Sequence, residues 1–336
     1  MGNTDNTITI SSQWKALTDD YPKIPMITIS GGWKPVWEGY VSVSGQWKQW
    51  WAGPGDRGIF GGGSGVIDYI TISTIPTCTD FGDLLTAVGN CGAASNGGRN
   101  RGIFGGGWVA SFTNVIQYIT ISTPSNAIDF GDRTIAKYGV TGTSNGTNDR
   151  GIFAGGKTDT NVIDYVTINT LGNATNFGDL TVARRWASSS SNRTNERGVF
   201  SGGGNGTRII DYITINTAGN ATTFGTLTVA AYIFSGTDNG INDRGVVGGG
   251  QTSLVDIQYI TISTTGDSDD FGDLTVGRSY TSSHSNATNE RGIWGGGTTG
   301  TATNVIDYIT INSIGNATDF GDLTVARGHA AGCSNA

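Results

Sequence analysis

The feature that most constrains this sequence is a motif, Arg-Gly-[Ile/Val]-[Phe/Val/Trp], that recurs six times. At intervals of 44 to 49 residues it begins at Arg57, Arg101, Arg150, Arg197, Arg244 and Arg291. Each copy continues through a Gly-rich turn, a segment such as VIDYITI (66–72), a Gly/Asn turn and a block such as DFGDLTVAR (319–327). A stretch of small residues ending in Ser-Asn completes the repeat. Four short β-rich segments per repeat, without helical periodicity, predict four-stranded blades arranged radially.

The order of the segments predicts how the ring of blades closes. The first repeat starts at the second strand of a blade, and a leftover first strand, HAAGCSN (329–335), follows the last repeat. We expect this strand to complete the first blade, which removes the open sheet edges. The predicted fold is all-β: a six-bladed β-propeller over residues 53–336, closed by its C-terminal strand, with small residues on the innermost strands.

Residues 1–52 carry a different, shorter repeat: ITISSQWK (8–15), ITISGGWK (27–34) and VSVSGQWK (41–48). Apolar alternation around a Ser/Gly turn predicts a small segment of β-hairpins. Six of the nine tryptophans fall in it: Trp14, Trp33, Trp37, Trp47, Trp50 and Trp51. So small a segment cannot bury them alone, so we expect attachment to a partner or to copies of itself. Covering the side of the propeller is the alternative.

Charge and composition exclude several classes. The net charge is −7 and no basic stripe is present, which argues against a nucleic-acid partner. No apolar run approaches the roughly 20 residues of a membrane helix, and the N-terminus lacks a secretory pattern. Cys78, Cys91 and Cys333 lack metal-ligand spacing, so we expect buried thiols of a chain made in a reducing cytoplasm. A bridge between Cys91 and Cys333, in adjacent blades, stays open.

The repeat resembles kelch repeats, in which a double glycine ends the second strand, an aromatic residue lies in the third, and an aromatic residue and a later arginine surround the fourth. Gly202-Gly203, Tyr212 and Phe224 follow this order. The later arginine corresponds to Arg184, Arg278 and Arg327 and to Lys137, and is replaced by Val88 and Ala231. The fourth strand departs from the pattern, with Phe-Gly-Asp where kelch repeats usually have Trp. The resemblance covers residues 57–336 and implies a kelch-like architecture.

The tandem Trp-Lys pattern and the Gly-rich DFGDLT repeats resemble segments of bacteriophage tail fibres and other virion appendages. The resemblance implies an N-terminal segment bound to other virion proteins and a propeller that recognises a host-surface receptor. It further implies a virion location after synthesis in the host cytoplasm, and a homo-oligomer, for which a trimer suits a fibre. The alternative is a structural capsid-decoration or tail component that binds only other virion proteins.

Comparison of the repeats with one another predicts which face binds. The turns between second and third strands and the junctions between blades vary, and strand alternation places both sets on one face. They carry Trp108, Phe112, Tyr138, Arg185, Trp186, Tyr232, Tyr280 and His329. Exposed aromatic and Arg side chains on a rigid scaffold are common binding anchors. A glycan that stacks on them is the ligand we expect first, with neutral drift as the alternative.

No catalytic pattern stands out. The two histidines, His284 and His329, fall in different blades, and no Ser–His–Asp order or zinc spacing is present. Asp-Phe-Gly-Asp pairs such as Asp80/Asp83 recur in most blades, whereas an enzyme needs one site. We expect these carboxylates to cap turns or pair with arginines such as Arg57, with calcium ligation as the alternative. We therefore expect no enzymatic activity, metal or cofactor; a polysaccharide hydrolase or lyase would need clustered carboxylates on the variable face.

Overall fold

The structure is a computed structural model that describes residues 55–336, apart from 75–77, 205, 231 and 252–253, and four strands between residues 26 and 52. The chain divides into two compact units, Met1–Pro54 and Gly55–Ala336.

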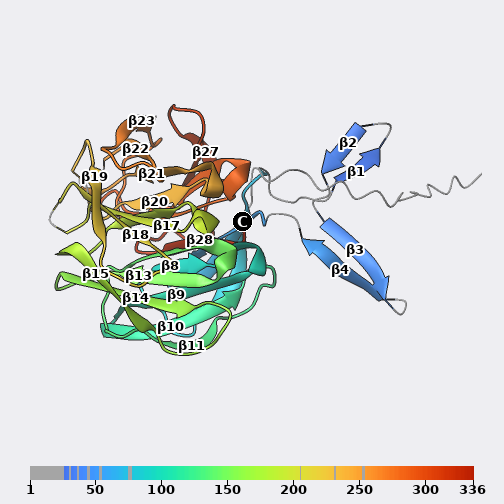
Figure 1. Ribbon diagram of the computed structural model, residues 1–336, viewed down its shortest axis with the longest axis horizontal. Coiled ribbons are helices and arrows are strands. Elements are labelled where there is room, and N and C mark those ends of the chain that lie inside the picture. The colour runs from blue at the N-terminus through green and yellow to red at the C-terminus, as the bar shows by residue number, and fades with distance from the viewer. Residues whose placement is uncertain are drawn as a thin grey trace, which may run out of the picture. The chain divides into compact units, whose positions relative to one another are not determined.

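The first unit contains two antiparallel strand pairs (Figure 1). They are β1 (Met26–Ile29) with β2 (Gly32–Pro35), and β3 (Glu38–Val43) with β4 (Gln46–Ala52). Equivalent positions of the short repeat pair in both, Ile27 with Lys34 and Val41 with Lys48. The predicted attachment residues Trp14 and Trp37 lie outside the described residues, as do the side chains of Trp33, Trp47, Trp50 and Trp51.

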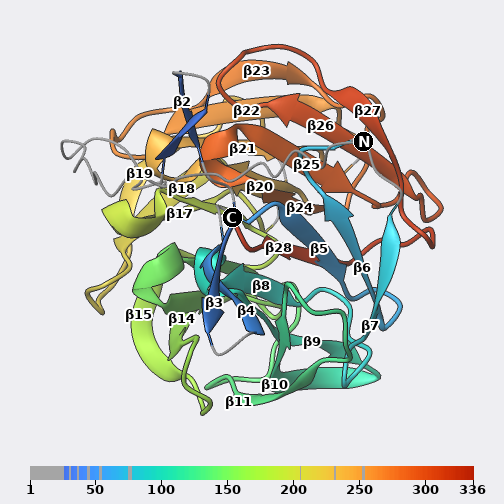
Figure 2. The ribbon, with the colours of Figure 1, turned by 90° about the vertical axis from the view of Figure 1, so that its right-hand side faces the viewer.

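The second unit is a six-bladed β-propeller, as predicted, built from six four-stranded antiparallel sheets (Figure 2). From the innermost strand outward, blade 1 is β28 (Ala331–Ser334), β5 (Arg57–Gly61), β6 (Val66–Thr71) and β7 (Thr79–Asp83). Blade 2 is β8 (Gly92–Ser95), β9 (Arg101–Val109), β10 (Ser111–Thr120) and β11 (Ile128–Asp132). Blade 3 is β12 (Thr141–Ser144), β13 (Arg150–Ala154), β14 (Thr160–Thr167) and β15 (Thr175–Arg184).

The other three blades follow the same order. Blade 4 is β16 (Ser188–Ser191), β17 (Arg197–Ser201), β18 (Ile209–Thr214) and β19 (Thr222–Thr226). Blade 5 is β20 (Ser235–Asp238), β21 (Arg244–Gly248), β22 (Asp256–Thr261) and β23 (Asp269–Asp273). Blade 6 is β24 (Ser282–Ser285), β25 (Arg291–Gly295), β26 (Val305–Thr310) and β27 (Thr318–Asp322). Short 3₁₀ turns follow inner strands at η1 (Gly97–Arg99), η2 (Gly146–Asn148), η3 (Arg193–Asn195), η4 (Gly240–Asn242) and η6 (Ala287–Asn289).

The ring closes as the sequence predicts, because β28 pairs with β5 and places Ala331 opposite Gly61. The turn that follows each inner strand is reproduced across the break in the chain. The amide of Arg57 donates to Asn335 Oδ1 at 2.9 Å, as the amide of Arg101 donates to Asn96 Oδ1 at 2.7 Å within blade 2. Both ends of the repeat region are therefore held in one sheet.

Small residues on the inner strands allow the blades to approach. A Cβ atom on Gly142 in β12 would lie 2.4 Å from the carbonyl oxygen of Ala93 in β8. Farther out, each second strand places a large apolar residue against the preceding blade, an aromatic residue in five blades and Val247 in blade 5. Phe153 of blade 3, for example, lies in one cluster with Ile103 and Ile116 of blade 2. Each such buried side chain contributes about 1.5–3 kcal/mol, so the core is a set of six interfaces between blades.

The repeated arginines stabilise those interfaces, but not in the predicted way. Arg57 Cζ lies 4.3 Å from the centroid of the Tyr69 ring, and its Nη1 donates to the carbonyl of Ile121 in blade 2 at 2.9 Å. All six copies repeat both contacts, at 4.3–4.6 Å from the ring and 2.8–3.1 Å from the carbonyl oxygen. The predicted pairing with the Asp-Phe-Gly-Asp carboxylates is wrong, because no ion pair among the described residues joins one of them to these arginines.

A second set of arginines forms buried ion pairs between blades. The pairs are Arg133–Asp164 (2.9 Å), Arg184–Asp211 (2.5 Å), Arg278–Asp307 (3.1 Å) and Arg327–Asp68 (2.6 Å), with every side chain at most 2% exposed. Lys137, which corresponds in the repeat to Arg184, Arg278 and Arg327, forms no such pair among the described residues. Arg133, in the position that Leu180 occupies in blade 3, supplies the guanidinium instead, and Lys137 donates to the Thr158 hydroxyl.

Candidate functional site

Two positions before each inner strand, the chain adopts a left-handed backbone conformation, with φ between 52° and 68°. We name these six residues the mouth ring: Asn90, Gly139, Trp186, Ile233, Tyr280 and His329. The amide of each donates to the carbonyl of the mouth-ring residue in the preceding blade at 2.8–3.3 Å, and Asn90 closes the circle by donating to His329. A left-handed conformation costs a residue with a side chain about 1–2 kcal/mol. Strain held by surrounding hydrogen bonds is typical of functional sites.

The predicted binding residues from two blades meet beside this ring. Trp108 and Phe112 lie opposite each other on β9 and β10, with ring centroids 5.5 Å apart. Tyr138 contacts both, at 5.4 Å from Trp108 and 5.2 Å from Phe112. Trp108 is 44% exposed and Phe112 38% exposed. Since a large, rigid apolar surface is left open to solvent here, the hairpin has the character of a binding element rather than of core.

Trp186 connects this group of aromatic residues to the mouth ring. Its ring lies 6.2 Å from Tyr138, stacks on Tyr232 at 6.4 Å and 25°, and meets Tyr280 edge-on at 6.1 Å and 89°. We name the connected set the aromatic array: Trp108, Phe112, Tyr138, Trp186, Tyr232 and Tyr280. The residues of the array come from several different repeats. Their rings form a continuous series of contacts from the β9–β10 hairpin to the mouth ring.

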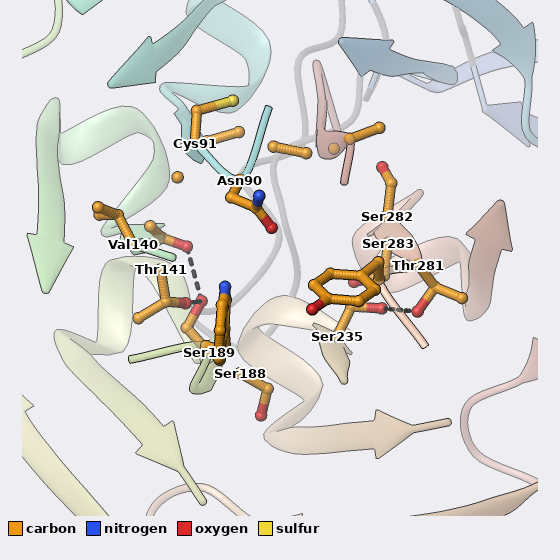
Figure 3. Close-up of a pocket in the computed structure, with 18 of the residues that line it drawn as sticks. Asn90, Cys91, Val140, Thr141, Ser188, Ser189, Ser235, Thr281, Ser282 and Ser283 are labelled. Carbon is orange, nitrogen blue, oxygen red and sulfur yellow. Dashed lines mark hydrogen bonds between the residues drawn. The ribbon is translucent and has the colours of Figure 1, made fainter. Parts of the chain in front are cut away.

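A cavity of about 120 Å³ lies inside the mouth ring, and Asn90, Trp186, Tyr280 and His329 line it. Hydroxyl groups of the inner strands surround its deeper part (Figure 3). Thr141 Oγ1 donates to Ser189 Oγ at 3.0 Å, whereas the indole Nε1 of Trp186 is buried with no hydrogen-bond partner among the described residues. Ser188 Oγ and Ser282 Oγ, which also line the cavity, likewise have no hydrogen-bond partner among the described residues. This polar lining with unpaired groups is suited to a small polar group.

His329 and Asn90 form a polar edge of the cavity. The distance from His329 Nδ1 to Asn90 Oδ1 is 2.9 Å; because an amide oxygen only accepts, Nδ1 carries the proton and Nε2 remains an acceptor. Burial lowers the pKa of His329, which favours this neutral form. His329 also lies 3.8 Å from the ring of Tyr280, whose pKa is raised by burial and by the neighbouring Tyr232 and Tyr138.

Three cations surround the aromatic array. Arg185 Cζ lies 4.8 Å, and Lys157 Nζ 5.3 Å, from the centroid of Trp186. Lys137 Nζ lies 6.0 Å from the centroid of Phe112. Arg185 pairs with Asp159 at 2.5 Å. These distances are within the range of cation–π attraction, so the cations are held close to the surface that the aromatic rings present.

All eight residues predicted to form the binding face thus lie in one connected group. Sequence reasoning missed Lys137 and Lys157 as members, because their proximity to aromatic rings depends on neighbouring blades. It also missed the left-handed conformation of the mouth ring. A signal was present, because Trp186 and Tyr280 occupy the position that is a glycine, Gly139, in another repeat. His284 lies apart: it is buried, with its ring 4.5 Å from that of Phe60.

No family model matches the sequence, and no curated protein matches it. Within residues 55–336 as described, no group of three or more His, Cys, Asp or Glu residues is placed to hold a metal ion. No helix among the described residues is long and apolar enough to cross a membrane.

Proposed function

We propose that the propeller binds a saccharide on the aromatic array and the mouth ring. The observation that carries the proposal is the continuous contact of six aromatic rings that ends at a polar cavity. A sugar ring has an apolar C–H face and a polar hydroxyl rim. The array offers flat surfaces for the first, and Trp186 Nε1, Asn90 and the inner-strand hydroxyls offer hydrogen bonds for the second.

The scaffold supports a binding role in preference to catalysis. Cyclic hydrogen bonds fix the mouth ring, and buried ion pairs fix the blades on which the array lies, so little conformational freedom is lost on binding. The titratable groups at the mouth are His329 and Tyr280, whose perturbed pKa values keep both neutral near pH 7. The Asp159 carboxylate beside the array is held in an ion pair with Arg185, and neutral groups at the mouth suit recognition better than acid–base hydrolysis of a glycosidic bond, which uses two carboxyl groups.

We place this propeller in a bacteriophage tail fibre-like appendage of the virion. The support is the resemblance of the Trp-Lys repeat in residues 1–52 to virion appendage segments. The segment would attach to other virion proteins, and the propeller would recognise a host-surface glycan. The kelch-like assignment of the blades belongs to the same proposal. Its support is the order Gly202-Gly203, Tyr212 and Phe224, which fall after β17, within β18 and within β19 respectively.

A glycan array and a host-cell binding assay with the full chain test the proposal. Trp108→Ala removes an exposed ring from the array, and we expect it to weaken binding about tenfold or more, since aromatic anchors commonly contribute over 1.4 kcal/mol. Ile314→Ala, which trims an exposed apolar residue (60%) outside the array, is the control and is expected to bind normally. If the full chain binds no glycan or cell yet still joins particles, the structural virion alternative replaces this proposal.

A further inference from the structure

We propose that the saccharide is anionic, with its acidic group held by Lys137, Lys157 and Arg185. This inference rests on the proposed saccharide binding and adds the ligand's charge. The three cations lie within 6.0 Å of rings in the aromatic array, while the whole chain has a net charge of −7. A positive cluster on an acidic protein, located on an exposed aromatic surface of the described propeller, indicates charge complementarity to a ligand.

The positive charge of the cluster is only partly neutralised by the protein. Arg185 has Asp159 as an ion-pair partner at 2.5 Å. Among the described residues, no carboxylate forms an ion pair with Lys137 or Lys157. The Lys137 ammonium donates to the Thr158 hydroxyl at 2.8 Å, a neutral partner. Two ammonium groups therefore remain available to an external anion.

A purely structural role for these lysines fits the fold less well. Where a cation serves the scaffold, as at Arg57, it lies over a tyrosine ring and also donates to a carbonyl of the next blade. Lys157 lies over Trp186, but no interaction with a protein oxygen is found for its ammonium in the part of the chain that the structure describes. A bound anionic group that accepts hydrogen bonds from the Lys157 ammonium would explain why this side chain lies beside the indole.

The geometry assigns distinct roles to ring and cation. A sugar stacked on the array brings its ring substituents to the edge of the indole, where Lys157 and Arg185 lie. A carboxylate, sulfate or phosphate on that sugar would contact the ammonium or guanidinium group. Hexuronic acids, sialic acids and sulfated or phosphorylated sugars share this chemistry, and matched probes separate them.

The test presents the full chain with paired oligosaccharides on one array. Each uronic or sialic acid-bearing probe lies beside the same probe with its carboxyl groups reduced to primary alcohols. Each sulfated or phosphorylated probe lies beside its desulfated or dephosphorylated form. We expect the acidic member of at least one pair to bind about tenfold or more tightly than its neutral counterpart at 50 mM salt, and the difference to shrink at 500 mM salt as screening shortens the range of the charges.

Charge-removing variants locate the effect. Lys157→Gln and Lys137→Gln are each expected to weaken binding of the acidic probe about threefold, and the variant with both changes and Arg185→Gln about tenfold or more. Binding of the neutral counterpart should weaken less than binding of the acidic probe in each variant. Arg99→Gln is the matched control: this residue is 51% exposed and follows the other end of β8, away from the mouth ring.

The outcomes separate this inference from the proposed function. Equal binding of acidic and neutral members, with Trp108→Ala weakening both, overturns the anionic ligand and leaves saccharide binding in place. A charge preference that Arg99→Gln reduces as much as Lys157→Gln also overturns it, since general attraction would then explain the effect. Absence of binding to every probe overturns both proposals.

Discussion

Arg327 Nη2 donates to Asp68 Oδ2 at 2.6 Å across 259 positions of the chain, joining the last blade to the first. Arg184 and Asp211 make the equivalent contact between blades 3 and 4 at 2.5 Å. The closing interface is therefore chemically the same as an internal one, and the ring does not depend on the pairing of β28 with β5 alone.

At the two described blade interfaces that have no buried ion pair, both the arginine and the aspartate are replaced. Where blade 1 meets blade 2, Val88 and Gln117 replace arginine and aspartate, and Gln117 Nε2 donates to the Thr86 carbonyl at 2.9 Å. Gln258 holds the corresponding place between blades 4 and 5 and accepts from the Thr228 amide at 2.9 Å. At the described blade interfaces, each buried aspartate of this kind therefore has an arginine partner, as expected because an isolated buried charge is costly.

This pairing predicts the effect of removing one charge. In Asp211→Gln, Arg184 stays 1% exposed but loses its carboxylate, and we expect the free energy of unfolding to fall by about 3 kcal/mol or more. The measurement is equilibrium denaturation in urea followed by circular dichroism.

A second change supplies the control for that experiment. Arg184→Val in the Asp211→Gln background recreates the Val88/Gln117 combination, so most of the lost stability should return. A double variant less stable than Asp211→Gln would contradict the pairing rule.

The blades and their closure were predictable from the sequence because both depend on a pattern internal to each repeat. The partners of the arginines were not, since Arg57 and Arg133 reach into the next blade, where sequence distance exceeds 30 residues. One signal was present in the sequence. The position of Asp68 is aspartate where the preceding blade supplies an arginine, and glutamine, as at Gln117, where it does not.

The binding face was predictable in outline for a similar reason. Variation between repeats singled out Trp108, Trp186 and Tyr280, and the structure brings them into one array. Which rings touch, and that Lys157 lies over Trp186, depends on how neighbouring blades are oriented. The strained mouth-ring conformation likewise depends on hydrogen bonds between blades rather than on local sequence.

Burial of His284 predicts a dependence of stability on pH. Burial lowers its pKa from 6.5 to about 3, so the unfolded chain binds the proton more readily between these values. The contribution of neutral His284 to the free energy of unfolding is fully present above pH 6.5 and is lost as the pH falls toward 3. By pH 5 the loss is on the order of 2 kcal/mol.

The variant His284→Thr isolates that contribution, because threonine occupies the equivalent inner-strand positions Thr143 and Thr237. The variant is expected to be less stable at pH 7 but to lose less stability than the parent between pH 7 and pH 5. Parallel pH profiles for the two proteins would show that His284 does not titrate as its burial implies.

The three cysteines should be unreactive in the folded protein. Burial raises the pKa of Cys78, Cys91 and Cys333 to about 12, which leaves about a thousandfold less thiolate than an ordinary thiol at pH 8. We expect negligible labelling by a disulfide reagent under native conditions and three labelled thiols in denaturant. One labelled thiol in denaturant would instead show a Cys91–Cys333 bridge, contrary to the free thiols of the structure.

Gly139 is predicted to control the placement of the central indole. Its φ is +68°, and a Cβ atom there would lie 2.7 Å from Trp186 Nε1. Gly139→Ala should therefore displace the indole, lower stability by about 1–2 kcal/mol, alter tryptophan fluorescence and weaken saccharide binding. Gly98→Ala is the control, since a Cβ atom at Gly98 meets nothing within 4 Å. If Gly139→Ala loses stability but binds saccharide normally, the placement of the Trp186 indole is not required for recognition, and other rings of the array carry the affinity.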